Sequence, residues 1–503
     1  MEENKEQEII EEKKKKLINW INNKYNKTIL GIVFFSFIIN IYYFNLTKNQ
    51  AHWWDSLAYG GLAKESILYL WSNNAFLAHE AVIRAPLLPL LWSILLRFNL
   101  SDPSIIFILE IIPSIISVYL VYLIGKELYD EKVGIISAFL FSTSWLVIFY
   151  TMRIMTDIPA MFFSLLSIYF FSKSYRNFNL KLFSLSIFFL SLAVLSRTVS
   201  YIIGGIFIVL ILINKKHHFI KNKNFWIGGI IGIIPLIILF ISNMIKYGNI
   251  IPSLSTYASS VGEKPGFAYY VITNFFPHTF GNVLLIFVIL GLLLIIVELI
   301  LGYGYYNKVK KIDSNILLFL ILISFLIFYI FILRAAEDRY LLVPLVPLLI
   351  FASRGILYIS DFIKKYNKEL ALLCIIIILV FSVYSQYKYG NPIIDGKKYS
   401  YIQMKEAFLW INENTPKDSV ITGDGIPLYT IYYAERKIYD YNISNPDGIF
   451  ANSDYIVLHR FEYQSQELIN LVNENQKYLT PVYGNFFDSQ KQQPAVIIYQ
   501  INK

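Results

Sequence analysis

The sequence is poor in charge and nearly devoid of cysteine. Only 16% of its 503 residues are charged, whereas 56% are hydrophobic. A soluble protein of this length could not bury so much apolar surface in ordinary domains. The single cysteine, Cys374, lies within an apolar run, which excludes a disulfide framework or a thiolate metal site within the chain. The composition therefore indicates a polytopic membrane protein.

Apolar runs that approach the length of a membrane-spanning helix, roughly 20 residues, recur along most of the chain. They lie at 29–46, 104–124, 133–150, 158–172, 182–196, 199–213, 226–243, 280–302, 315–333, 340–358 and 369–385. We therefore predict a polytopic α-helical fold with about eleven transmembrane helices over residues 29–385.

The lysines and arginines predict the orientation of the chain. With a cytoplasmic tail at 1–28, the inside loops hold clusters of basic residues, as the positive-inside rule requires; these loops are 173–181, 214–225, 303–314 and 359–368. They account for the net charge of +9 without a nucleic-acid partner. For the basic loops to lie inside, residues 85–96 must not cross the membrane. This segment is short and carries two prolines, so we predict an interfacial or re-entrant helix within the first outside loop, 47–102. The C-terminal segment, 386–503, is then extracytoplasmic.

The pattern of this C-terminal segment is that of a small water-soluble α/β domain. Helices are predicted at 404–412 and 466–475, and strands at 419–422, 437–441, 455–458 and 496–501. Gly423 and Gly425 follow a strand but lack the third glycine of a dinucleotide-binding fingerprint.

Two acidic residues on the predicted outer face are candidates for chemistry. Asp55 lies between aromatic residues just beyond the first span, and Asp157 precedes Pro159 at the start of another. Asp55 could instead be a solvated loop charge, and Asp157 or Thr156 could cap a helix. If both acids face one outer cavity, one could accept a proton while the other positions an amine, a hydroxyl or a metal ion.

Several short motifs, in this order, resemble the GT-C membrane glycosyltransferases, in the branch of protein O-mannosyltransferases and bacterial aminoarabinose lipid A transferases. Besides Asp55 they are Arg84-Ala85-Pro86-Leu87-Leu88-Pro89, Met152-Arg153-Ile154-Met155-Thr156-Asp157-Ile158-Pro159, Ser196-Arg197-Thr198, Arg339-Tyr340-Leu341-Leu342-Val343-Pro344 and Trp410-Ile411-Asn412-Glu413-Asn414-Thr415-Pro416. Protein mannosyltransferases have an Asp-Glu pair where this chain has Asp55 and Ser56. The resemblance therefore leaves open whether the acceptor is a protein, a lipid or a glycan.

The resemblance implies transfer of a sugar from a polyprenyl- or dolichyl-phosphate carrier to an acceptor hydroxyl at the outer face, with inversion. Asp55 would be the general base, and Asp157 is the second catalytic candidate. The departing phosphate needs cations in a site of low dielectric, and arginine binds phosphate oxygens through its planar fork. Arg84, Arg153 and Arg339 are the outside candidates, and their alternative role is to contact lipid headgroups.

Further residues near these motifs could line the substrate pocket: Trp54, Tyr59, His79, Glu80, Glu337, Asp338 and Tyr340. No cofactor is expected with certainty. A divalent cation, if one is used, would be held by Asp55, Asp157 and His79.

Two other functional classes compete with the glycosyltransferase. A transporter or lipid flippase should place ionisable groups at mid-membrane and show related halves. Of the acids, only Glu110 and Glu298 fall in the interior of the apolar runs, and we see no internal repeat. A structural membrane protein would simply display the outer α/β domain. Convergence of Asp55, Asp157 and the outside arginines in one cavity would favour the enzyme.

Overall fold

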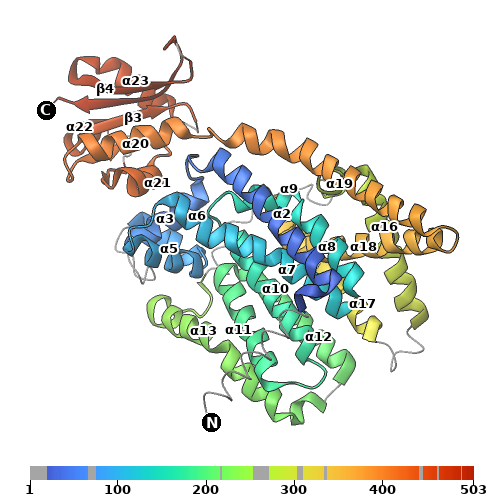
Figure 1. The fold of residues 1–503 in the computed structure, drawn as a ribbon. Helices are drawn as coiled ribbons and strands as arrows, with labels where there is room; N and C mark the ends of the chain where they lie inside the picture. Colours follow the sequence, from blue (N-terminus) through green and yellow to red (C-terminus); the bar gives the residue numbers. More distant parts are fainter. Residues whose placement is uncertain are drawn as a thin grey trace, which may run out of the picture. The chain divides into compact units, whose positions relative to one another are not determined.

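The computed structural model describes residues 20–65, 75–215, 218–252, 271–302, 310–333, 337–440, 446–461, 464–488 and 490–502 (Figure 1). Their contacts divide the chain into two compact units. The first, here called the membrane unit, comprises the described parts of 1–45, 106–152 and 156–394. The second, here called the tail unit, comprises the described parts of 46–105, 153–155 and 395–503.

Helices at the predicted apolar runs build the membrane unit. Within the described residues, seven helical segments are long and apolar enough to cross a membrane: Lys24–Thr47, Asp102–Leu128, Lys223–Tyr247, Thr273–Leu301, Asp313–Leu333, Asp338–Lys364 and Lys368–Asn414. Two further helices, α8 (Glu131–Ser142) and α9 (Trp145–Thr151), pass this test together and are bent by 55°. The predicted polytopic helical fold is therefore confirmed.

The remaining predicted runs also form helices, namely α10 (Asp157–Ser174), α11 (Leu180–Ser196) and α12 (Tyr201–Lys215). The other helices of this unit are α2 (Lys24–Thr47), α7 (Ile112–Leu128), α13 (Lys223–Tyr247), α16 (Phe276–Gly302), α17 (Lys310–Ile327), α18 (Leu342–Lys364) and α19 (Lys368–Lys397). Segments of π-helix adjoin three of them, at η2 (Phe107–Ile111) before α7, η5 (Val271–Phe275) before α16 and η7 (Phe328–Leu333) after α17. The total of about eleven spans stays a prediction.

Small residues let helices of the membrane unit approach closely. A Cβ atom on Gly291 of α16 would overlap the carbonyl oxygen of Phe351 in α18, and one on Gly355 would overlap that of Phe287. The Ser137 hydroxyl of α8 donates to the Ser353 hydroxyl of α18 over 2.9 Å. Small residues and hydroxyl contacts of this kind hold helices together where the lipid offers no hydrophobic driving force.

The C-terminal part of the tail unit is the predicted α/β domain. Its sheet has the strand order β2-β1-β3-β5-β4, with β1 parallel to β2 and β3, and β5 antiparallel to β3 and β4. The strands are β1 (Val420–Thr422), β2 (Lys437–Ile438), β3 (Tyr455–His459), β4 (Leu479–Phe486) and β5 (Pro494–Ile501). The helices are α20 (Ile402–Asn414), α21 (Pro427–Tyr429), α22 (Pro446–Asn452) and α23 (Gln466–Glu474). Ile449, Ile456 and Leu468 belong to one buried core cluster of this domain.

Three helices of the first predicted outside loop belong to the same unit: α3 (Trp54–Glu65), α4 (Ala75–Ile83) and α5 (Leu87–Arg97). At 1.5 Å per residue, the 11 residues of α5 extend for roughly 16 Å. This is about half the thickness of the bilayer hydrocarbon core, so the length of α5 agrees with an interfacial helix.

Candidate active site

Asp55 lies in the first turn of α3, where the partial positive charge of the helix N-terminus favours an acid. Its side chain is 29% exposed. Arg84 is the residue that follows α4, and its Nη1 donates to Asp55 Oδ1 over 3.0 Å. Asp55 is therefore an oriented carboxylate with part of its surface open, rather than a fully solvated loop charge.

Arg84 holds a second acid as well. Its Nε donates to Oε2 of Glu80, one helical turn earlier, and its guanidinium lies 4.9 Å from the centre of the Tyr59 ring. Burial opposes the charged form of Arg84, but Tyr59, Asp55 and Glu80 outweigh it and raise the pKa of Arg84 above its ordinary value. The structure thus brings together four residues that the sequence singled out. We call Asp55, Tyr59, Glu80 and Arg84 the acid–arginine cluster.

The segment that precedes α10 is joined to the start of α3. The Ser56 hydroxyl donates to the Ile154 carbonyl oxygen over 2.7 Å. The Arg153 guanidinium lies 4.1 Å from the centre of the Trp53 ring, and Arg153 is only 3% exposed. Trp54, another predicted pocket residue, is the first residue of α3 and is half-buried. Arg153 therefore belongs to the same unit as Asp55 and is fixed next to the residues that lead into α3.

Asp157 lies in the membrane unit, as the first residue of α10. Thr156 occupies the N-cap position without a side-chain cap hydrogen bond. The Asp157 carboxylate instead forms an ion pair with Arg197, the residue that follows α11. The Asp157 side chain is only 1% exposed. This pair ties the start of α10 to the end of α11.

Residues that precede α18 lie close to the Arg197 side chain. The Arg197 guanidinium lies 4.9 Å from the centre of the Tyr340 ring, and that of Arg339 lies 5.5 Å from it. Arg339 Nε pairs with Glu337. Asp338 is the first residue of the 3-10 turn η8 (Asp338–Leu341), which also contains Arg339 and Tyr340. The sequence did not single out Arg197 as a site residue, although its motif and its place on the predicted outer face were available as signals.

No group of three or more histidine, cysteine, aspartate or glutamate side chains that could hold a metal ion occurs among the residues that the structure describes. His79 lies on α4, but its side chain is outside the described part. A cation site formed by Asp55, Asp157 and His79 stays a prediction.

Comparisons with known proteins agree with this fold. Residues 84–241 match a family model described as dolichyl-phosphate-mannose-protein mannosyltransferase. We found no match among curated proteins. Among solved structures, the Archaeoglobus fulgidus oligosaccharyltransferase tethered with an acceptor peptide is similar over 96% of this chain and 75% of that chain, with 13% identity and a TM-score of 0.59.

Two bacterial structures are similar as well. ArnT from Cupriavidus metallidurans in the apo state aligns over 93% of this chain and 97% of that chain, with 8% identity and a TM-score of 0.64. The arabinofuranosyltransferase AftD from Mycobacteria aligns over 93% of this chain and 41% of that chain, with 12% identity and a TM-score of 0.55. The chain therefore has the GT-C fold, as the resemblance in the sequence predicted.

Proposed function

We propose that the protein is a membrane glycosyltransferase that transfers a sugar from a polyprenyl- or dolichyl-phosphate carrier to an acceptor hydroxyl at the extracytoplasmic face. The proposal is supported by the GT-C fold and by the mannosyltransferase family match. An ArnT structure contains undecaprenyl phosphate, and an oligosaccharyltransferase structure from Archaeoglobus fulgidus contains dolichol phosphate. A carrier of this kind is therefore the donor that we assign to this chain.

In the proposed reaction, Asp55 takes the proton of the acceptor hydroxyl. The acceptor oxygen forms a bond to the anomeric carbon while the bond from that carbon to the carrier phosphate breaks, with inversion. The electron pair of the broken bond leaves with the polyprenyl phosphate, whose growing charge needs cations nearby. The single observation that carries this assignment is the acid–arginine cluster, because it orients a carboxylate that is 29% exposed.

The arginines take two different roles in this proposal. Arg84 contacts two carboxylates, which favours a positioning role toward Asp55, although its predicted contact with the donor phosphate stays a prediction. Arg153 and Arg339 remain the candidates for the leaving phosphate. Each has a guanidinium stacked on an aromatic ring, which fixes the direction of its fork.

The transporter alternative depends on charges within the spans. Glu298 of α16 accepts from Arg354 of α18 over 2.6 Å and from Asn315 over 2.7 Å, so this acid belongs to a compensated polar network. Glu110 is fully buried within η2. The hydrogen bonds of Glu298 with Arg354 and Asn315 are of the kind that holds packed helices together. They give no specific support to a transport pathway.

The test of the proposed function is the Asp55→Asn variant. Asparagine keeps the size of the side chain but cannot take a proton, and loss of general-base catalysis costs about 10²–10⁴-fold in rate. Release of free polyprenyl phosphate from a polyprenyl-phosphate sugar should fall by this factor, whereas binding of the donor should persist. Turnover within a few-fold of the wild type would exclude Asp55 as the base.

A further inference from the structure

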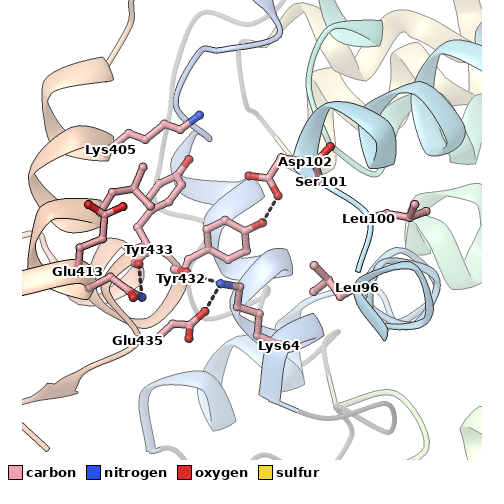
Figure 2. Close-up of a pocket in the computed structure, with 12 residues that line it drawn as sticks. Lys64, Leu96, Leu100, Ser101, Asp102, Lys405, Glu413, Tyr432, Tyr433 and Glu435 are labelled. Atoms are coloured by element: carbon pink, nitrogen blue, oxygen red, sulfur yellow. Dashed lines mark hydrogen bonds and ion pairs between the residues drawn. The ribbon is translucent and has the colours of Figure 1, made fainter. Parts of the chain in front are cut away.

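The tail unit contains a cavity, lined by polar side chains and three leucines, to which the proposed reaction assigns no role. Its volume is about 300 Å³, at the lower end of the range that ligand sites have (Figure 2). It lies between the end of α3, the chain that follows α5, helix α20 and the π-helical turn η9 (Thr430–Ala434). A wider depression of about 790 Å³ adjoins it and shares Lys64, Leu96, Leu100 and Glu435 with its lining.

The wall of the cavity is rigid because its polar groups bind one another. The Tyr432 hydroxyl donates to Asp102 Oδ1 over 2.7 Å (Figure 2). Asp102 Oδ2 lies 2.8 Å from His52 Nε2. Burial, followed by the charge of Asp102, raises the pKa of Tyr432, which keeps its hydroxyl protonated and donating. The backbone nitrogen of His52 donates to the Tyr433 hydroxyl over 2.9 Å. This network fixes the two tyrosine rings in place.

The charges at the rim offset one another. Lys64 Nζ lies 2.5 Å from Glu435 Oε1 and donates to the Tyr432 carbonyl oxygen over 2.7 Å. Lys405 and Glu413 on α20 add one charge of each sign to the lining. A cavity whose lining mixes lysine, carboxylate, amide and hydroxyl side chains suits a neutral ligand rich in hydroxyl groups better than an anion or a metal ion.

The distance between the cavity and Asp55 along α3 sets a minimum length for a ligand that would occupy both places. Lys64 lies nine residues beyond Asp55 on this helix, which corresponds to roughly 14 Å along its axis. If the hydroxyl that is glycosylated lies at Asp55, a ligand held at Lys64 must be longer than a single sugar ring.

We infer that this cavity binds a sugar unit of an oligosaccharide acceptor, one or more units away from the hydroxyl that is glycosylated. The inference rests on the proposed function and names the acceptor class of the same reaction. Lys405 and Glu413 would hydrogen-bond to hydroxyl groups of the bound sugar.

The test measures glycan binding and glycan transfer separately on the full-length protein. The probes are fluorescently labelled linear oligosaccharides of glucose, galactose, mannose and N-acetylglucosamine, with serine- and threonine-containing peptides as the rival acceptors. The Lys405→Ala/Glu413→Ala variant removes two polar side chains from the lining. Lys417→Ala/Asp418→Ala is its matched control, because both of these residues are exposed in the same unit and are absent from the residues that line the cavity.

We expect at least one oligosaccharide to bind, and the cavity variant to raise its Kd and its KM by about tenfold or more, since each lost hydrogen bond to a ligand weakens binding severalfold. The control variant should match the wild type. Binding of a glycan without any release of polyprenyl phosphate would contradict the proposed function but support the cavity. Turnover with peptides alone, no glycan binding, or equal values in the two variants would overturn the inference.

Discussion

Replacing Arg84 by glutamine should separate the two roles open to this residue. The substitution removes a cation that contacts both Asp55 and Glu80. The Arg84 side chain is 11% exposed, and those of Asp55 and Glu80 are 29% and 10% exposed. Removing one partner of a buried ion pair typically costs 3–5 kcal/mol, and the exposure of Asp55 puts the expected loss of stability near the lower value, about 3 kcal/mol.

The same substitution should change the pH dependence of turnover. A general base acts only when it is ionised, and a carboxylate that loses a neighbouring cation holds its proton more readily. The acidic limb of the kcat/KM profile should therefore move to higher pH, by about one to three units. A pure phosphate contact predicts a different result, namely a loss of about a hundredfold at every pH with the limb unchanged.

The assay is release of polyprenyl phosphate from the lipid-linked sugar across the pH range, with thermal unfolding of the same preparation. Arg84→Lys keeps the charge but loses the planar fork, and should fall between the wild type and Arg84→Gln. Arg460→Gln is the control, because Arg460 is an exposed arginine of the same unit. An unshifted limb together with unchanged thermal stability would refute the positioning role.

Two further predictions concern the orientation of the chain and the second acid. In a Cys374→Ser background, a membrane-impermeant maleimide should label exposed Lys417→Cys in intact cells but exposed Lys365→Cys only after lysis; the reverse pattern would place the proposed site on the cytoplasmic side. Arg197→Gln should lower stability by about 3–5 kcal/mol, because it leaves the buried carboxylate of Asp157 without this cation. Arg197→Gln/Asp157→Asn should recover most of that loss in thermal unfolding, and an equal loss in both variants would argue against a stabilising pair.

The helical part of the fold was predictable because each run of apolar residues is a local signal. The α/β domain was predictable only in part. Four of its strands lie at their predicted positions, but the sequence did not indicate β4. This strand contains Pro481, Gly484 and Asn485, residues that are rare within strands, and it lies at the edge of the sheet beside β5. Its pairing with β5, rather than its own composition, makes it a strand.

The candidate residues were predictable by type, but their pairings were not. Asp55 and Arg84 are 29 positions apart, and Asp157 and Arg197 are separated by two helices. The network of Asp102 and Tyr432 joins residues 330 positions apart, and it left no local pattern in the sequence. Such pairs form when the fold buries a charge, because an opposite charge or a hydrogen-bond donor must then offset the loss of water.

Exposure distinguishes the Asp55–Arg84 pair from the Asp157–Arg197 pair. Both Asp55 and Asp157 lie in the first turn of a helix, and each is bound by an arginine from another element. A general base must reach the proton that it takes, and Asp55 is 29% exposed whereas Asp157 is 1% exposed. A closed ion pair between the ends of two helices is suited to holding α10 and α11 together. We therefore assign the proton transfer to Asp55, and we expect Asp157→Asn to lower stability more than it lowers the rate of the folded enzyme.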